Sequence, residues 1–100
     1  ALAAFRKLGA AHPRDPRVLQ GWAAAAVKTR GWGEALRVAV TWASIDDSAA
    51  AQLHLARLQR AAGQRYGAVA TLTRLLDRDP DQAEAREMLA RLADAKLAAR

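Results

Sequence analysis

A pattern of large and small residues recurs along this chain at a fixed interval of 33 positions. Leu55 follows Trp22 at this interval, and Ala68 follows Ala35. A fixed period in this range is typical of helical repeat arrays. Each unit of such an array buries its apolar face only by stacking on the next unit. The period therefore predicts an all-α architecture, and it favours an interaction surface over an enzyme.

The composition agrees with one helical domain over residues 1–100. Hydrophobic residues make up 52% of the chain and aromatic residues only 5%, and the frequent Ala, Leu and Arg all favour helices. The sequence has no apolar run of 18 residues and no cysteine, so we expect no membrane span, disulfide or thiolate metal site. Arg6 and Lys7 follow the first apolar residues, which is the wrong order for a secretory signal. The compartment stays open between cytoplasm and periplasm.

Six helices are predicted from the spacing of apolar residues and from the breaks between them. They are expected at about residues 1–11, 16–29, 33–45, 49–62, 66–78 and 82–98. Asp15 suits the N-cap of the second helix, and Pro16 suits its first helical position. Asp47 or Ser48 is expected to cap the fourth helix, and Gly63 to end it.

The large residues are expected to face the core of the repeats. Trp22, Trp32 and Trp42 are all assigned to inward positions, because aromatic side chains supply much of the area that a core buries. Val40 and Tyr66 are assigned inward as well. At the start of the last helix, Asp81 and Glu84 have the spacing of a capping box.

The pattern resembles the tetratricopeptide repeat, a pair of antiparallel helices of about 34 residues. With Pro16 as the first position of a unit, Trp22 and Ala23 fall at the family's paired Leu-Gly positions. Trp32 falls at the aromatic of the turn, and Ala35 at the small residue that opens the second helix. The resemblance implies a right-handed α-solenoid of about six helices.

The same resemblance divides the chain into repeats. It implies the second helix of a partial repeat at 1–15, full repeats at 16–48 and 49–82, and a final or capping helix at 83–100. Asp47 stands where the family has its closing proline, and Trp42 stands where the family favours alanine. We therefore expect locally altered curvature in the unit that contains Trp42.

No set of residues with catalytic or metal-binding spacing is apparent. His12 and His54 lie in different units, and neither has a second histidine four positions away. The acidic run 77–81 resembles the start of a calcium loop, which requires Gly at position six and Glu at position twelve. Gln82 and Met88 occupy those places instead. We predict that the chain is not an enzyme and binds neither metal nor cofactor.

The resemblance also implies which residues would line the family's concave groove. By matching position, the residues expected to contact a partner are Arg17, Gln20, Ala24, Lys28, Leu53, His54, Arg57, Arg60 and Arg91. Ala24 and Leu53 are expected to form an apolar floor, with the arginines as polar anchors. Glu87 and Arg91 can instead form an ion pair within their helix. The family's C-terminal carboxylate clamp requires lysine and asparagine at positions that are held here by Gln20, Ala24, Leu53 and Glu87. Binding of a peptide's C-terminal carboxylate by this clamp is therefore not expected.

The leading hypothesis is a non-catalytic protein–protein interaction module that belongs to a larger tetratricopeptide repeat protein. The formal charge of +6 leaves open a basic helical repeat that binds nucleic acid. A regulatory segment of a multidomain enzyme is the second alternative. Leu2 and Phe5 on the first helix lack a preceding partner helix, so self-association through this helix is a further possibility.

Overall fold

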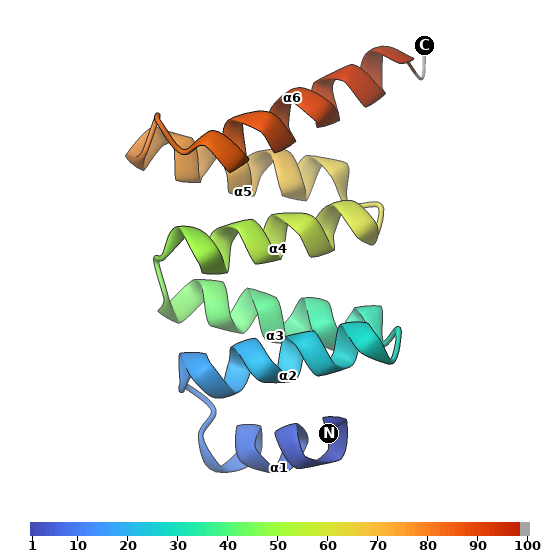
Figure 1. Cartoon of the computed structure of the whole chain (residues 1–100), viewed down its shortest axis with the longest axis vertical. Coiled ribbons are helices and arrows are strands. Elements are labelled where there is room, and N and C mark those ends of the chain that lie inside the picture. Colours follow the sequence, from blue (N-terminus) through green and yellow to red (C-terminus); the bar gives the residue numbers. More distant parts are fainter. Residues whose placement is uncertain (99–100) are drawn as a thin grey trace. The chain divides into compact units, whose positions relative to one another are not determined.

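The computed structural model describes residues 1–98 of the chain, with side chains described through residue 93. Within that part all regular structure is helical, and all six predicted helices are present (Figure 1). They are α1 (Leu2–Ala11), α2 (Pro16–Lys28), α3 (Trp32–Ile45), α4 (Ala49–Ala61), α5 (Arg65–Arg78) and α6 (Ala83–Ala98). None of the described helices has the length and apolar composition needed to cross a membrane.

Short polar side chains begin two of the helices, as predicted. At α2, the Oδ1 atom of Asp15 accepts a hydrogen bond from the backbone N–H of Arg17 at 3.0 Å, and Pro16 is the first helical residue. At α4, the Oγ atom of Ser48 accepts a hydrogen bond from the N–H of Ala51 at 3.2 Å. Each bond satisfies a backbone donor that the first turn of a helix leaves without an intrahelical partner.

The predicted capping box at the start of α6 is wrong. The side chain of Gln82, and not that of Asp81, accepts the free backbone donors of the first turn. Its Oε1 atom lies 3.0 Å from the N atom of Glu84 and 3.2 Å from the N atom of Ala85. The longer glutamine side chain reaches both N–H groups from the position next to the helix, which begins at Ala83.

The chain divides into two compact units, residues 1–51 and residues 52–100. We call them the N-terminal unit and the C-terminal unit and describe each by itself. In the N-terminal unit, the antiparallel helices α2 and α3 enclose an apolar cluster, against which Trp22 and Ile45 are partly buried. The cluster consists of Leu19, Ala23, Val38, Trp42 and Ala51.

Two glycines allow α1 to pack closely on α2. A Cβ atom at Gly9 of α1 would lie 2.3 Å from the ring of Trp22 on α2. A Cβ atom at Gly21 of α2 would lie 2.4 Å from the ring of Phe5 on α1. Each aromatic ring therefore occupies the space that a side chain on the opposite helix would need. The two helices are held by reciprocal ring-on-glycine contacts that no larger residue could replace without movement.

The core of the C-terminal unit is aliphatic apart from one buried polar residue. Its buried hydrophobic side chains are Leu53, Leu55, Ala56, Leu58, Ala68, Leu72, Leu75, Ala85, Met88 and Leu92. Thr71 of α5 is fully buried. Its hydroxyl lies 2.7 Å from Oε1 of Gln59 on α4 and 3.0 Å from the carbonyl oxygen of Gly67. Because these acceptors satisfy the hydroxyl, the core tolerates it without an unpaired polar group.

Each unit has one helix turn with a residue of positive φ, and the two residues are 33 positions apart. Arg30 after α2 has a φ of 60°, and Gly63 after α4 has a φ of 81°. The next residue closes the turn in both units. Gly31 N–H donates to the Ala26 carbonyl at 2.8 Å, and Gln64 N–H donates to the Gln59 carbonyl at 2.7 Å. The prediction that Gly63 ends α4 is confirmed, and the sequence period reappears as an identical turn.

Three of the residues predicted to face the core are exposed instead. Trp32 is 43%, Val40 48% and Tyr66 81% exposed. Trp32 and Tyr66 lie in the first turns of α3 and α5, where side chains tilt back past the end of the helix. Val40 lies two residues after the buried Val38, which places it on the other side of α3. Trp42 is buried at 3% exposed, as predicted.

Candidate partner-binding site

In the N-terminal unit, the residues expected to meet a partner share one face of α2. Arg17, Gln20, Ala24 and Lys28 are all exposed. Their spacing of three or four residues aligns them along the helix. This face is therefore a solvent-accessible strip with a cation at each end and the small Ala24 in between.

In the C-terminal unit, the predicted residues of α4 differ in accessibility. Arg57 and Arg60 are exposed and His54 is half-buried. Leu53 is only 6% exposed, so little of its side chain is available to a partner. Burial lowers the pKa of His54, and the nearby Arg57 charge lowers it further. The imidazole is therefore neutral at pH 7, and the charge of this face comes from the arginines.

Two ion pairs hold one arginine of α4 and one arginine of α6. The Arg57 guanidinium pairs with the Glu84 carboxylate and thereby connects α4 to α6. On α6, Nη2 of Arg91 lies 2.6 Å from Oε1 of Glu87, which confirms the pair expected within that helix. All four side chains are at least half exposed. Water therefore screens both pairs, and each adds little to stability.

The three predicted arginines of this unit lie around one surface hollow. The hollow has a volume of about 210 Å³. Its lining residues are Arg57, Arg60, Glu84, Glu87, Met88 and Arg91. We call it the mixed hollow, because it carries both signs of charge. Arg57 and Arg60 come from α4 and Arg91 from α6, so residues 31 to 34 positions apart in the sequence line one depression.

A second hollow, of about 230 Å³, lies at the turn between α4 and α5. Its lining residues are Arg60, Gly63, Arg65, Arg91 and Leu92. We call it the arginine hollow, because three of its five described lining residues are arginines and none of these five is acidic. Arg65 was not among the predicted site residues. The signal that could have found it is the segment 57–74, which holds four arginines and no acidic residue.

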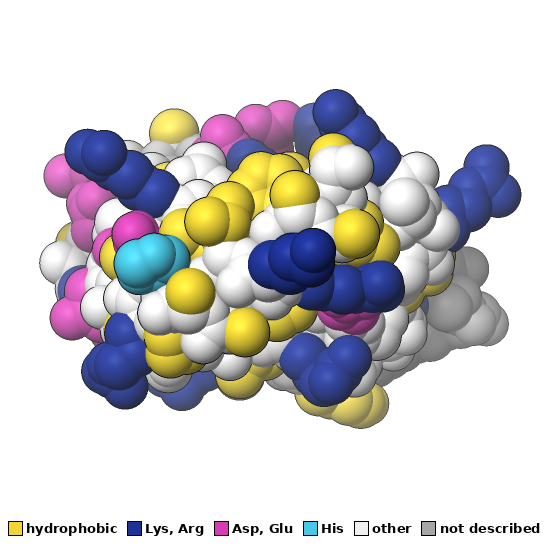
Figure 2. Space-filling model, turned by 90° about the horizontal axis from the view of Figure 1, so that it is seen from below, with side chains coloured by type: hydrophobic (Ala, Val, Ile, Leu, Met, Phe, Trp, Pro, Cys, Tyr) yellow, Lys and Arg dark blue, Asp and Glu magenta, His cyan; other side chains and the backbone are white. Residues whose placement is uncertain are grey.

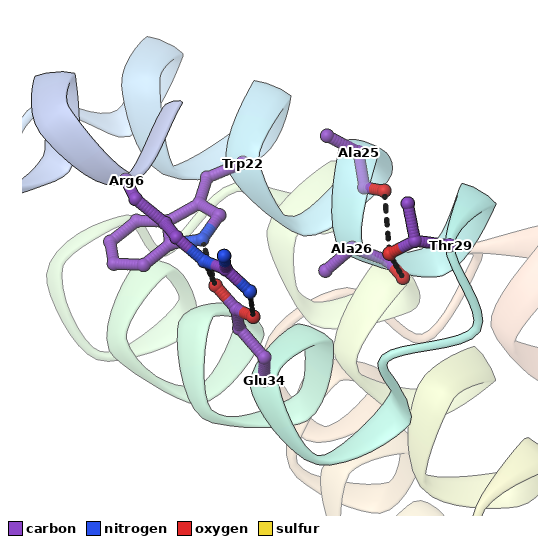
Figure 3. Close-up of polar contacts among 6 residues, drawn as sticks. All are labelled: Arg6, Trp22, Ala25, Ala26, Thr29 and Glu34. Carbon is purple, nitrogen blue, oxygen red and sulfur yellow. Dashed lines mark hydrogen bonds and ion pairs between the residues drawn. The ribbon is translucent and has the colours of Figure 1, made fainter. Parts of the chain in front are cut away.

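The best-formed polar cluster lies in the N-terminal unit and was not predicted (Figure 3). Glu34 of α3 receives two hydrogen bonds from the Arg6 guanidinium of α1, at 2.7 and 2.9 Å. It receives a third from the indole N–H of Trp22 on α2, at 2.7 Å. The Arg6 bonds, followed by the Trp22 bond, lower the pKa of Glu34 to about 2. All its donors come from the chain itself, so this cluster joins three helices.

The outer surface of α1 is partly apolar. On the face that Figure 2 shows, hydrophobic side chains lie exposed among Lys and Arg. Leu8 is 44% exposed, and Leu2 and Phe5 are half-buried. Self-association through this helix stays a prediction. No group of three or more His, Cys, Asp or Glu among the described residues could hold a metal ion.

Comparison with known proteins identifies a family match in the second half of the chain. Residues 49–92 match the family model of the tetratricopeptide repeat, whereas no curated protein matches the chain. The match begins at the first residue of α4 and includes α5 and most of α6. Repeats of this family serve in general as protein–protein interaction scaffolds, and the family is typically non-catalytic. The match shows a tetratricopeptide repeat at residues 49–92, and the all-helical architecture of the described residues is consistent with a helical repeat.

Proposed function

We propose that this chain is a non-catalytic module of a larger tetratricopeptide repeat protein and binds a segment of a partner protein. In the C-terminal unit the residues proposed to contact a partner lie on α4 and α6, and in the N-terminal unit they lie on the exposed face of α2. The observation that carries this proposal is the convergence of Arg57, Arg60 and Arg91 on the mixed hollow. Fold alone does not define function, and the proposed function therefore depends on that surface.

The chemistry of the mixed hollow suits a polar peptide segment. Guanidinium groups bind carboxylates through two parallel hydrogen bonds, and their planar shape also packs on peptide groups. Arg57 and Arg91 are held by their acidic partners, so their positions are partly ordered before a partner arrives. Such preorganisation reduces the entropy lost on binding. The alternating positive and negative charges of the mixed hollow then contribute more to the choice of partner than to the affinity for it.

The same charges disfavour nucleic acid as the partner. Glu84 and Glu87 line the mixed hollow beside the arginines, and a run of phosphates would meet both carboxylates. Binding to nucleic acid depends strongly on the number of phosphates neutralised and weakens steeply with salt. The lining of this hollow also contains no aromatic side chain on which a base could stack.

Site-specific crosslinking followed by a binding measurement tests the proposal. A photo-crosslinking residue replaces Ala61, the exposed neighbour of Arg60, or the exposed Ala70 on α5 as the control. We expect the residue at position 61, and not that at 70, to crosslink a discrete protein in a lysate of the source organism. The crosslinked segment is then purified and titrated against the chain.

Matched variants decide whether the arginines carry the binding. The double variant Arg57→Gln/Arg91→Gln should weaken binding of the identified segment by tenfold or more. Arg74→Gln/Arg86→Gln removes two exposed arginines outside the hollow and should leave binding unchanged. Equal loss in both variants would indicate general charge attraction. Crosslinking to nucleic acid at low salt that disappears at moderate salt would favour the alternative function.

A further inference from the structure

The arginine hollow carries positive charge that the described residues do not neutralise. Arg91 at its edge is paired with Glu87. Arg60 and Arg65 make no ion pair or side-chain hydrogen bond within the part of the chain that the structure describes. Two guanidinium groups without a carboxylate therefore border one hollow of about 230 Å³. Like charges that share a depression repel one another, and an anion placed between them relieves that repulsion.

The shape of the hollow defines what kind of anion fits. Gly63 contributes no side chain, and Leu92 supplies an apolar wall. The arginine hollow adjoins the mixed hollow, because Arg60 and Arg91 line both. A ligand that enters the arginine hollow can thus continue along α4 and α6. This continuity suits a chain-like ligand with one acidic stretch, and not a small free ion.

We propose that the arginine hollow binds a pair of neighbouring Asp or Glu side chains of an acidic peptide segment. Two carboxylates match the two uncompensated guanidinium groups, Arg60 and Arg65, in charge. The remainder of the segment lies in the mixed hollow against Met88 and the Arg–Glu pairs. The inference rests on the proposed function in one respect, since the acidic pair belongs to the partner segment.

The positions that form this hollow differ from those of the family's C-terminal carboxylate clamp. In this chain the clamp positions hold Gln20, Ala24, Leu53 and Glu87, and none of them lines the arginine hollow. Arg65 belongs to α5, the second helix of its repeat. The acidic pair can therefore lie within a peptide and need not be at its carboxyl terminus.

Site-resolved NMR titration with two synthetic peptides tests the inference. The probe is a ten-residue peptide with a central Glu-Glu pair among uncharged residues, and the control replaces the pair by Gln-Gln. We expect the Glu-Glu peptide to cause saturable shifts of the backbone amides of Gly63 and Arg65. The Gln-Gln peptide should cause none of these shifts. Equal shifts with both peptides would overturn the inference.

Two double variants with the same loss of charge make the test specific. Arg60→Gln/Arg65→Gln should weaken binding of the Glu-Glu peptide at least tenfold, while Arg74→Gln/Arg86→Gln should change it less than twofold. Matching thermal unfolding curves confirm that both variants fold. Equal weakening in both would overturn the inference in favour of general attraction. A response only to a phosphoserine peptide would overturn the assignment to carboxylates.

The outcome is separable from that of the proposed function. If position 61 crosslinks a partner protein but the Gly63 and Arg65 amides do not respond to the Glu-Glu peptide, the acidic-pair inference fails and the proposed function stands. If the Glu-Glu peptide binds at these amides while no protein crosslinks at position 61, the proposed function fails as stated. The hollow then remains an acidic-peptide site without the proposed partner.

Discussion

The two units are built on the same repeat but are fastened by different polar contacts. Buried Ala26 and Val38 in the N-terminal unit correspond, 33 positions later, to Gln59 and Thr71 in the C-terminal unit. Gln59 and Thr71 form a hydrogen bond of 2.7 Å between α4 and α5. The N-terminal unit has apolar side chains at both positions. The repeat thus fixes which positions face inward, and not whether they are polar.

The reverse holds at another pair of equivalent positions. Glu34 in the N-terminal unit joins Arg6 and Trp22 in a charged cluster. The matching residue of the C-terminal unit is Gly67, where a Cβ atom would lie 3.0 Å from the Gln59 amide. One unit is therefore fastened by an ion pair near its surface, and the other by a neutral hydrogen bond in its interior. Exchanging residues between equivalent positions tests this difference.

The largest effect is expected at the third tryptophan and its counterpart, Leu75. Trp42 is 3% exposed and Leu75 is also 3% exposed. Replacement by alanine leaves a cavity at either position, and the larger side chain leaves the larger one. We expect Trp42→Ala to cost about 3–5 kcal/mol of unfolding free energy and Leu75→Ala about 2–5 kcal/mol. Urea unfolding followed by circular dichroism measures both, and a greater loss at Leu75 would contradict the ranking.

The next effect comes from exchanging the polar and apolar core residues. Thr71→Val removes the hydroxyl that bonds Gln59, and Val38→Thr buries a hydroxyl where the N-terminal unit has no such partner. We expect each change to lower stability by about 1–3 kcal/mol. Thr71→Ser, which keeps the hydroxyl, is the control for the first change. If Val38→Thr proves neutral, the two cores are more alike than their hydrogen bonds indicate.

Smaller effects are expected at the two turns, where substitution should lower stability at one turn and raise it at the other. Gly63 adopts a φ of 81° without strain, whereas Arg30 adopts a φ of 60° at a cost. We expect Gly63→Ala to destabilise the chain by about 1 kcal/mol. Arg30→Gly relieves the strain but increases the freedom of the unfolded chain, so a gain of at most about 1 kcal/mol is expected. Thermal unfolding of both variants gives the signs, and the same sign for both would contradict the comparison.

The smallest effect concerns pH. Glu34 has its pKa lowered from 4.5 to about 2, so the unfolded state binds more protons within that range. The stability that Glu34 contributes is full above pH 4.5 and is lost as the pH falls toward 2. The lowered pKa of His54 acts in the same direction but from a higher starting point, below pH 6.5.

Two variants separate these pH effects. Glu34→Gln should flatten the loss of stability between pH 4.5 and pH 2 and leave the loss that begins below pH 6.5 in place. Arg6→Gln should also reduce the loss of stability between pH 4.5 and pH 2, because the Arg6 hydrogen bonds are the largest cause of the lowered pKa of Glu34. Urea midpoints measured from pH 7 to pH 2.5 provide the comparison. An unchanged acid profile in both variants would show that the cluster does not contribute.

The sequence predicted the features of the fold that depend on neighbouring residues. Asp15, Pro16, Ser48 and Gly63 act within a turn of their own positions, and each does what its residue type favours. The cap of α6 was assigned to the wrong residue because the spacing of Asp81 and Glu84 does not show that the longer Gln82 side chain reaches both donors from the position next to the helix. The exposure of Tyr66 was missed because helical spacing does not show that a first-turn side chain tilts back past the end of its own helix.

Contacts between distant residues could not be predicted in this way. Arg6 and Glu34 are 28 positions apart, and no motif links them. The candidate site was predicted in part, because Arg57 and Arg91 occupy equivalent repeat positions. Arg65 was missed because it belongs to the other helix of its repeat. Matching to the family's groove positions identifies residues on the first helix of each repeat. The arginine hollow is also lined by residues of the turn that follows that helix and of the start of α5.

The placement of the aromatic residues gives the chain two separate optical reporters. Trp22, Trp32 and Trp42 all lie in residues 1–51, whereas Tyr66 lies in residues 52–100. Intrinsic tryptophan emission therefore reports only on the N-terminal unit, with the buried Trp42 as the probe of its core. The far-ultraviolet circular dichroism signal of the helices reports on both units. Coincident transitions would mean that the two units unfold as one, and separate transitions would mean that each melts alone.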